Sequence, residues 1–330
     1  MAKPPRHKLT LYGVAACISL GIALLPSHLN QAAHAENQRT SDSLPNTATL
    51  SIKSDESNRA PVSLYRGWDY LVERLRLHGV KERDLVALYG NPSMPPFTFV
   101  PFKLRPRESH SIYAGFLSRQ NFKLGANFIR LQRREFDRMQ ERLKVPREIV
   151  AAILVVESQI GKNTGKEMVL YRLSRVSSVA APENIRRNFE ILRKDDNSVT
   201  LTAVENRANY LEATFLPEIP ALIEISKRNK INALNVRGSI AGAFGFPQFL
   251  PSAFLKYGLD GNRDGVVSLY NDVDALWSAA NYLASYGYHK ELPLPERRAI
   301  LWRYNKSDAY IDTVLAVGEG IIGELDRSSK

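Results

Sequence analysis

One stretch of the chain decides the fold: residues 146–166 read PREIVAAILVVESQIGKNTGK. Pro146 is well placed to open a helix, and eight consecutive apolar residues follow at 149–156. A helix that is apolar on all sides is a buried helix. The glycine-containing segment 161–166 is typical of a flexible turn that ends it. The stretch therefore predicts a central buried helix with Glu157 near its C-terminal end.

The position of Glu157 is suited to acid chemistry. Its carboxylate would lie against apolar walls and near the negative end of the helix dipole, and both effects favour the protonated form. A carboxyl group with a raised pKa is what a general acid for glycosidic cleavage needs. This segment alone leaves open a second interpretation, a boundary glutamate that simply reaches solvent.

The first 60 residues predict export rather than core structure. Basic residues precede a mostly apolar run at 9–25, and small residues follow at 33–35, which predicts a signal peptide over residues 1–35. An uncleaved membrane anchor, or lipidation at Cys17, the only cysteine, are the alternatives. Residues 36–60 are polar and predict a linker. Beyond residue 35 the chain carries +8 of its formal charge of +11, which suits an anionic polymer or membrane surface.

The remainder, residues 61–330, predicts a mostly α-helical domain. Trp68, Leu71, Val72 and Leu75 have helical spacing, and a long amphipathic helix is expected near 121–144. The proline-rich stretch 91–107 should wrap over the surface. Strand signals are few, and residues 197–203 and Gly265–Leu269 are the best candidates.

Two further segments could contact a ligand. Residues 238–252, GSIAGAFGFPQFLPS, combine small residues with aromatic rings, so the backbone could approach a sugar closely while Gln248 supplies an amide. The alternative is a plain turn into a helix. Residues 304–310, YNKSDAY, could place Tyr304 and Asn305 in a saccharide groove, or Asn305 or Ser307 could instead cap the last helix.

An acidic loop, DGNRDG at residues 260–265, matches the opening of a calcium loop. Its predicted oxygen ligands, in loop order, are Asp260, Asn262, Asp264, the Val266 carbonyl and Asn271. The usual residue at the last of these positions is a bidentate glutamate, so two carboxylates would make a lower-affinity site. An Asx turn is the alternative interpretation.

Taken together and in this order, these motifs resemble the membrane-bound lytic transglycosylase B family of bacterial murein-degrading enzymes. Residues 156–166 meet the family pattern V-E-(S/T)-x-x-G-x-x-x-G-K, and residues 238–252 meet G-S-x-A-G-A-x-G-x-x-Q-F-x-P-S. The acidic loop, Asn281-Tyr282 and Tyr304-Asn305 follow in the expected places. The resemblance covers residues 63 to 325.

The resemblance implies an α+β lysozyme-like fold, with a helical part at 61–120 and a catalytic core at 121–330. It implies an elongated saccharide groove and an EF-hand-like calcium loop at 260–272, with no required cofactor. Glu157 matches the catalytic glutamate. The positions that match groove residues are Ser239, Gln248, Tyr282, Tyr304 and Asn305. The sequence departs from the pattern at Pro247, where glycine is common, and at Asn271, which replaces an acid.

The function that the resemblance implies is lytic cleavage of the MurNAc-GlcNAc β-1,4 bond in peptidoglycan. No second acid accompanies Glu157 in the groove motifs, which favours formation of a 1,6-anhydro ring over two-carboxylate hydrolysis. A muramidase-type hydrolase and a non-catalytic peptidoglycan-binding protein remain the alternatives. We expect a periplasmic monomer that binds glycan strands, with wall-synthesis proteins as candidate partners and no nucleic acid.

Overall fold

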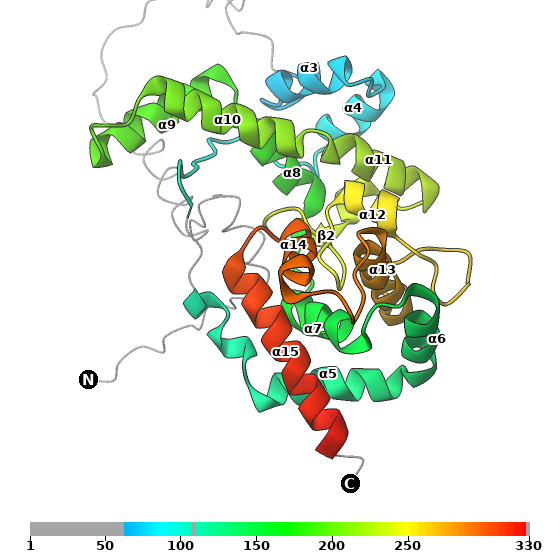
Figure 1. Cartoon of the computed structure of the whole chain (residues 1–330). Helices are drawn as coiled ribbons and strands as arrows, with labels where there is room; N and C mark the ends of the chain where they lie inside the picture. The colour runs from blue at the N-terminus through cyan, green and yellow to red at the C-terminus, as the bar shows by residue number, and fades with distance from the viewer. Residues whose placement is uncertain (1–62, 107–109, 328–330) are drawn as a thin grey trace, which may run out of the picture.

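The computed structural model of the chain describes residues 63–106 and 110–327, and nearly all of its regular structure is helical (Figure 1). The predicted signal peptide and linker lie outside the described residues. None of the described helices is long and apolar enough to cross a membrane. The N-terminal part holds helices α3 (Asp69–Leu77) and α4 (Glu82–Tyr89) and the short 3-10 helices η2 (His110–Ile112) and η3 (Ala114–Phe116).

The remaining elements build the larger part of the molecule. In chain order they are α5 (Arg119–Leu131), α6 (Arg133–Leu143), α7 (Arg147–Ser158), β1 (Glu167–Met168), α8 (Val169–Ser177), α9 (Pro182–Asp195), α10 (Leu201–Phe215), α11 (Glu218–Arg228), η4 (Ala233–Asn235), β2 (Arg237–Gly238), α12 (Pro251–Tyr257), α13 (Asp272–Ser285), α14 (Leu294–Tyr304) and α15 (Asp308–Arg327).

Helix α7 is the centre of the fold. Every residue from Ile149 to Ser158 is buried, as its apolar sequence predicts. The helices that cover it come from both sides of it in the sequence: α5 and α6 precede it, and α13 and α15 follow it (Figure 1). Helix α15, the last in the chain, packs on both α5 and α7. The prediction that Pro146 separates α7 from the preceding helix is confirmed, since Pro146 is its N-cap residue.

The prediction of one long helix at 121–144 is wrong. Two helices, α5 and α6, meet at Gln132, whose backbone angles (φ −101°, ψ 30°) leave the helical region. The reason is tertiary: α5 packs against α15, whereas α6 packs against α13. The side chain of Gln132 is held at the break, because its Nε2 donates to Asp272 Oδ2 at 2.6 Å.

The two strand predictions are also wrong. Thr200 lies in the first predicted segment and caps α10 instead, its hydroxyl accepting from the Ala203 N–H. Residues 265–269 carry no strand. The strands are the two-residue segments β1 and β2, paired antiparallel with Glu167 opposite Gly238. They bring the segment after α7 against the start of the glycine-rich segment 238–252.

The proline-rich segment is irregular as predicted, but it does more than cover the surface. Val100 and Phe102 are buried, and two asparagines of α9 hold their backbone. Asn184 Oδ1 accepts from Val100 N at 2.8 Å and its Nδ2 donates to Val100 O at 3.1 Å, while Asn188 Oδ1 accepts from Phe102 N at 3.1 Å. These amides replace the hydrogen bonds that a neighbouring strand would supply.

We predict that Asn184→Ala destabilises the protein by about 2–3 kcal/mol, because it leaves the buried Val100 N–H without a partner, although Asn188 still donates to Val100 O. Urea unfolding followed by circular dichroism measures the difference. The neighbouring Glu183→Ala variant is the control: Glu183 is exposed, so its removal should change stability by less than about 0.5 kcal/mol. Equal losses in the two variants would contradict the role given to Asn184.

Candidate active site

Glu157 lies in the last turn of α7 and is 7% exposed. The helix positions it there because the apolar residues before it are all buried, so the chain reaches polar surroundings only at the helix end. Glu157 is therefore buried at the helix end, and the side chains shown near it are those of Tyr304 and Tyr310. The alternative of a boundary glutamate open to solvent does not fit a side chain so little exposed.

The turn after Glu157 is tight and strained. Gln159, Ile160 and Gly161 all have positive φ (51°, 55° and 80°), which is unfavourable for the first two. The turn is nevertheless well bonded: Gln159 N donates to Val155 O and Ile160 N to Leu154 O, each at 2.9 Å. These bonds satisfy carbonyls that the end of a helix leaves unpaired. The chain is therefore reversed immediately after the candidate acid.

Gly165 is the point where the segment after α7 meets the glycine-rich segment. Its φ is 91°, and a Cβ placed on it would lie 2.0 Å from the carbonyl oxygen of Gly238. Only glycine permits this approach of two backbones. A glycine of one sequence motif, Gly165, thus packs directly against a glycine of the other, Gly238. Ser239 follows immediately after this contact.

Gln248 ties the glycine-rich segment to the turn. Its Nε2 donates to Thr164 O at 3.1 Å and to Gly245 O at 2.7 Å, so these bonds engage the nitrogen end of the amide that we expected to meet a sugar. Gln248 itself has a φ of 50°. Its position is set by the fold, and a hydrogen bond to substrate would have to use Oε1.

Two tyrosines, Tyr304 and Tyr310, lie near Glu157, and a third, Tyr282, packs on Tyr304. The Tyr304 hydroxyl donates to Pro247 O at 2.7 Å, and its ring lies 4.8 Å from that of Tyr282. On its other side the Tyr304 ring stacks on Tyr310, with centroids 6.3 Å apart and planes 9° from parallel. Burial raises the pKa of Tyr304 well above its usual value, and the charge of Glu157 raises it further. The structure therefore places Tyr304 near Glu157 and packs Tyr282 against Tyr304.

Tyr310 is a site residue that the sequence analysis missed. It is completely buried near the start of α15. Burial raises its pKa well above the usual value, and the Glu157 carboxylate adds to this through its charge and its contact with the hydroxyl. The signal was present, because Tyr310 ends the same YNKSDAY segment. A single tyrosine at the start of a helix, however, has no pattern that separates it from a core residue.

Two polar atoms in the predicted groove set have no hydrogen-bond partner within the described part of the chain. They are Ser239 Oγ and Asn305 Oδ1, and both side chains are less than 10% exposed. Buried polar atoms are usually paired, so an unpaired one calls for an explanation. Substrate hydroxyl or amide groups are suitable partners. Asn305 does not cap α15, and Ser307 takes that position, its hydroxyl accepting from Tyr310 N at 3.2 Å.

The acidic loop folds around its own oxygen atoms. Asp260 accepts from the N–H groups of Asp264 and Gly265, and Asp264 accepts from Val266 N. Asn262 Nδ2 donates to Asp264 Oδ2 at 2.8 Å. Such inward-facing oxygens suit a hard cation. Among the described residues, however, no group of three or more His, Cys, Asp or Glu side chains is placed to hold a metal.

The structure gives Asn271 a different role from the predicted ligand. Its Oδ1 accepts from Val273 N and Asp274 N, so it caps helix α13. The buried carboxylate that closes the loop is Asp274, which accepts from the N–H groups of Gly261 and Ser268. Burial raises the pKa of Asp274 and the nearby Asp260 charge adds to the rise. Spacing alone pointed to residue 271, but the helix cap takes that side chain away.

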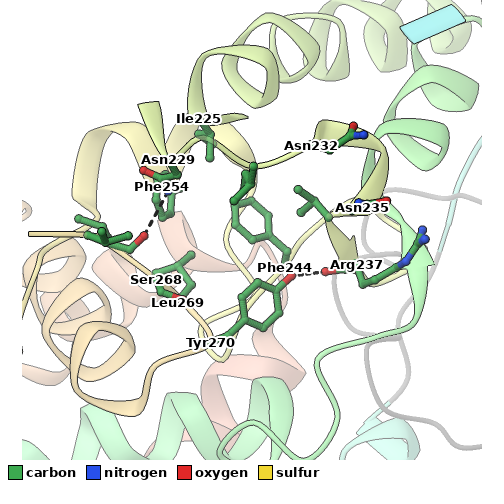
Figure 2. Close-up of a pocket in the computed structure, with 14 residues that line it drawn as sticks. Ile225, Asn229, Asn232, Asn235, Arg237, Phe244, Phe254, Ser268, Leu269 and Tyr270 are labelled. Carbon is green, nitrogen blue, oxygen red and sulfur yellow. Dashed lines mark hydrogen bonds between the residues drawn. The ribbon is translucent and has the colours of Figure 1, made fainter. Parts of the chain in front are cut away.

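An apolar hollow of about 440 Å³ is lined in part by the glycine-rich segment. Figure 2 shows the side chains that line it. Phe244, Phe254 and Leu269 line it, and the Tyr270 hydroxyl at its edge donates to the Arg237 carbonyl. No Asp, Glu, His, Cys or Lys lines it. Neither Glu157 nor any of the three tyrosines Tyr282, Tyr304 and Tyr310 lines the hollow, so we do not assign it to the candidate site.

Comparison with known proteins identifies relatives of this chain. Residues 68–299 match the family described as transglycosylase SLT domain. Membrane-bound lytic murein transglycosylase B of Escherichia coli (strain K12) is 29% identical over 175 residues, which are 53% of this chain and 41% of the relative. The match thus spans about two fifths of that protein's length.

Two solved structures have the same fold. The Escherichia coli lytic transglycosylase Slt35 in complex with calcium superposes with a TM-score of 0.56 and 21% identity, over 78% of this chain and 93% of that one. SltB3 from Pseudomonas aeruginosa in complex with NAG-NAM-pentapeptide gives a TM-score of 0.54 and 17% identity, over 78% and 79% of the two chains. The predicted fold class, mostly α and lysozyme-like, is confirmed.

We predict that Gly165→Ala disrupts the site, because the new methyl group would overlap the Gly238 carbonyl. The expected loss of stability is more than about 2 kcal/mol, beyond the roughly 1–2 kcal/mol that left-handed backbone alone costs an alanine. Thermal unfolding measures it. Gly79→Ala is the matched control, since Gly79 has a φ of 78° but nothing within 4 Å of a Cβ. Similar losses in both variants would refute the close approach as the cause.

Proposed function

Because the chain belongs to the transglycosylase SLT domain family, we propose that it is a peptidoglycan lytic transglycosylase in which Glu157 serves as the single catalytic acid and base. The observation that carries the proposal is the buried carboxylate at the end of α7, which lies close enough to Tyr304 and Tyr310 for its charge to raise the pKa of both. The family supports the class of reaction, and the burial of Glu157 at the site supports its assignment as the catalytic residue.

The described residues offer no second carboxylate that the tyrosine cluster shares. The other buried carboxylates are engaged elsewhere: Glu212 with Arg74, Glu218 with Ser252, Asp274 with the acidic loop, and Glu324 with Arg119. Two-carboxylate glycosidases need a second acid near the first as nucleophile or as base for water. A single carboxylate suits a reaction in which the substrate supplies its own nucleophile.

The proposed reaction has two proton transfers through one residue. Protonated Glu157 donates to the oxygen that leaves the anomeric carbon of N-acetylmuramic acid, and the neighbouring N-acetyl group assists departure. The Glu157 carboxylate then accepts the proton of the 6-hydroxyl of the same sugar. That oxygen bonds to the anomeric carbon and closes the 1,6-anhydro ring. No water is consumed, and Glu157 ends protonated as it began.

The surrounding residues would bind and orient the sugar. Ser239 Oγ and Asn305 Oδ1 are the unpaired polar atoms able to bond its hydroxyl and amide groups. The rings of Tyr304 and Tyr282 would pack against the sugar. The Tyr304 hydroxyl already donates to Pro247 O, so we assign its ring rather than its hydroxyl to substrate binding. We propose the periplasm as the compartment, supported by the predicted signal peptide and by a relative described as membrane-bound.

We predict that Glu157→Gln lowers the release of soluble muropeptides from purified sacculi by about 10²–10⁴-fold, because glutamine cannot transfer the proton. Mass spectrometry should find anhydro-terminated products from the wild type. Glu148→Gln is the control, since Glu148 is half-buried at the opposite end of the same helix. Its activity should match the wild type.

Each other outcome of this experiment points to a different function. Reducing-end products would make the protein a muramidase. Full activity of Glu157→Gln would remove the proposed acid. Binding to sacculi without release by the wild type would support a non-catalytic wall-binding protein.

We also propose that the acidic loop binds Ca²⁺ through the side-chain oxygens of Asp260, Asn262 and Asp264 and the Val266 carbonyl, with Asp274 adding negative charge. The inward oxygens and the mutual repulsion of Asp260 and Asp274 support it. A bound cation would stabilise the loop and take no part in catalysis.

We predict that adding Ca²⁺ after treatment with EDTA raises the melting temperature, because a ligand that binds only the folded state stabilises it. Asp260→Asn should abolish the increase, because it removes one of the two carboxylates that begin the loop. Asp326→Asn, at the far end of α15, is the control and should keep it. An unchanged melting temperature at millimolar Ca²⁺ would rule the site out.

A further inference from the structure

A second hollow lies beside the turn that follows Glu157. It has a volume of about 500 Å³ and is formed by the N-terminal half of α5 and the turn after α7. We name it the cationic hollow because three of its lining residues are Arg119, Lys123 and Lys162. Four side-chain amides and one leucine complete the lining, which contains no acidic and no aromatic residue.

The two lysines of the cationic hollow are available to a ligand. Arg119 is already paired, its Nε lying 2.8 Å from Glu324 Oε1. Lys123 and Lys162 form no ion pair within residues 63–106 and 110–327, and both are exposed. Two lysines in a concave surface without acids attract a ligand that carries carboxylates.

The cationic hollow is held next to the candidate acid. Gln159, one of its amides, lies two residues after Glu157, and its Oε1 accepts from Asn163 Nδ2 at 2.8 Å. Helix α5 packs directly on α7 (Figure 1). The strained left-handed turn at Gln159 and Ile160 therefore fixes the distance between the hollow and the reacting group.

We propose that the cationic hollow binds carboxylates of the peptide stem on the glycan strand that Glu157 cleaves, an inference that rests on the proposed function. The sugars of the strand present neutral hydroxyl and acetamide groups, and its ionised groups are carboxylates. A sugar ring would be expected to stack on an aromatic side chain, and the hollow has none. Its amides can bond the peptide groups of a stem, and its lysines can pair with the carboxylates.

The test compares two substrates and two double variants. The substrates are glycan strands with their stems and strands from which an amidase has removed the stems, which leaves the lactyl carboxylate of each muramic acid but none of the stem carboxylates. Lys123→Met/Lys162→Met removes both lysine charges at nearly constant side-chain length. Lys194→Met/Lys290→Met removes the same net charge from exposed positions on α9 and before α14 and is the matched control.

For Lys123→Met/Lys162→Met we expect KM on stem-bearing strands to rise about tenfold, or about threefold per lysine, with kcat unchanged. On stripped strands its KM should equal that of the wild type. The control variant should behave as the wild type on both. An equal rise on both substrates, or the same rise in the control variant, would overturn the proposal.

A binding measurement separates this proposal from the proposed reaction. Titration with a soluble disaccharide-tetrapeptide should show about tenfold weaker binding to the lysine variant even if the wild type proves catalytically inactive. Inactivity with this loss of binding would refute the proposed reaction and support the cationic hollow. If the lysine variant instead loses only its sedimentation with phosphatidylglycerol vesicles, the hollow binds a membrane surface and the stem proposal is wrong.

Discussion

The burial of α7 from Ile149 to Ser158 is the constraint on which the rest of the structure depends. A helix that is apolar on every side cannot face water anywhere, so other helices must cover it all round. The chain meets this demand with α5 and α6 before it and α13 and α15 after it. Because these helices are drawn from distant parts of the sequence, the segments that follow or precede them converge at the C-terminal end of α7, where Glu157 lies.

The same burial explains why strain gathers beyond Glu157. The chain must turn within a few residues, or the last polar groups of α7 would stay inside the core. Gln159 and Ile160 accept left-handed backbone for this purpose, and Gly165 lets the returning chain touch Gly238. The unfavourable backbone angles are offset by the hydrogen bonds of the turn and by the pairing of β1 with β2. The position of Ser239, directly after the contact of Gly165 with Gly238, is thus a consequence of how α7 ends.

Local patterns predicted the parts of the fold that local chemistry controls. The apolar run and Pro146 were sufficient for α7, and helical spacing was sufficient for α3. The break at Gln132 was not predictable, because it depends on α13 and α15, which lie more than a hundred residues later. Asn271 shows the same limit for one side chain. Its spacing in the loop predicted a metal ligand, but in the structure its side chain accepts from N–H groups of α13 and caps that helix. The side chain of Asn271 could serve as a metal ligand or as a helix cap, and long-range packing decides which of these roles it takes.

Tyr310 shows how this limit affects the site itself. Its position next to Glu157 requires α15 to cross α7, which no local pattern states. The buried Tyr310 side chain lies beside the Glu157 carboxylate, whose charge acts on its hydroxyl. Since burial and Glu157 both raise the pKa of Tyr310, the phenol stays neutral and remains a hydrogen-bond donor. If Glu157 acts first as acid and then as base, as proposed, a neutral phenol at this position would be placed to donate to its carboxylate between the two steps.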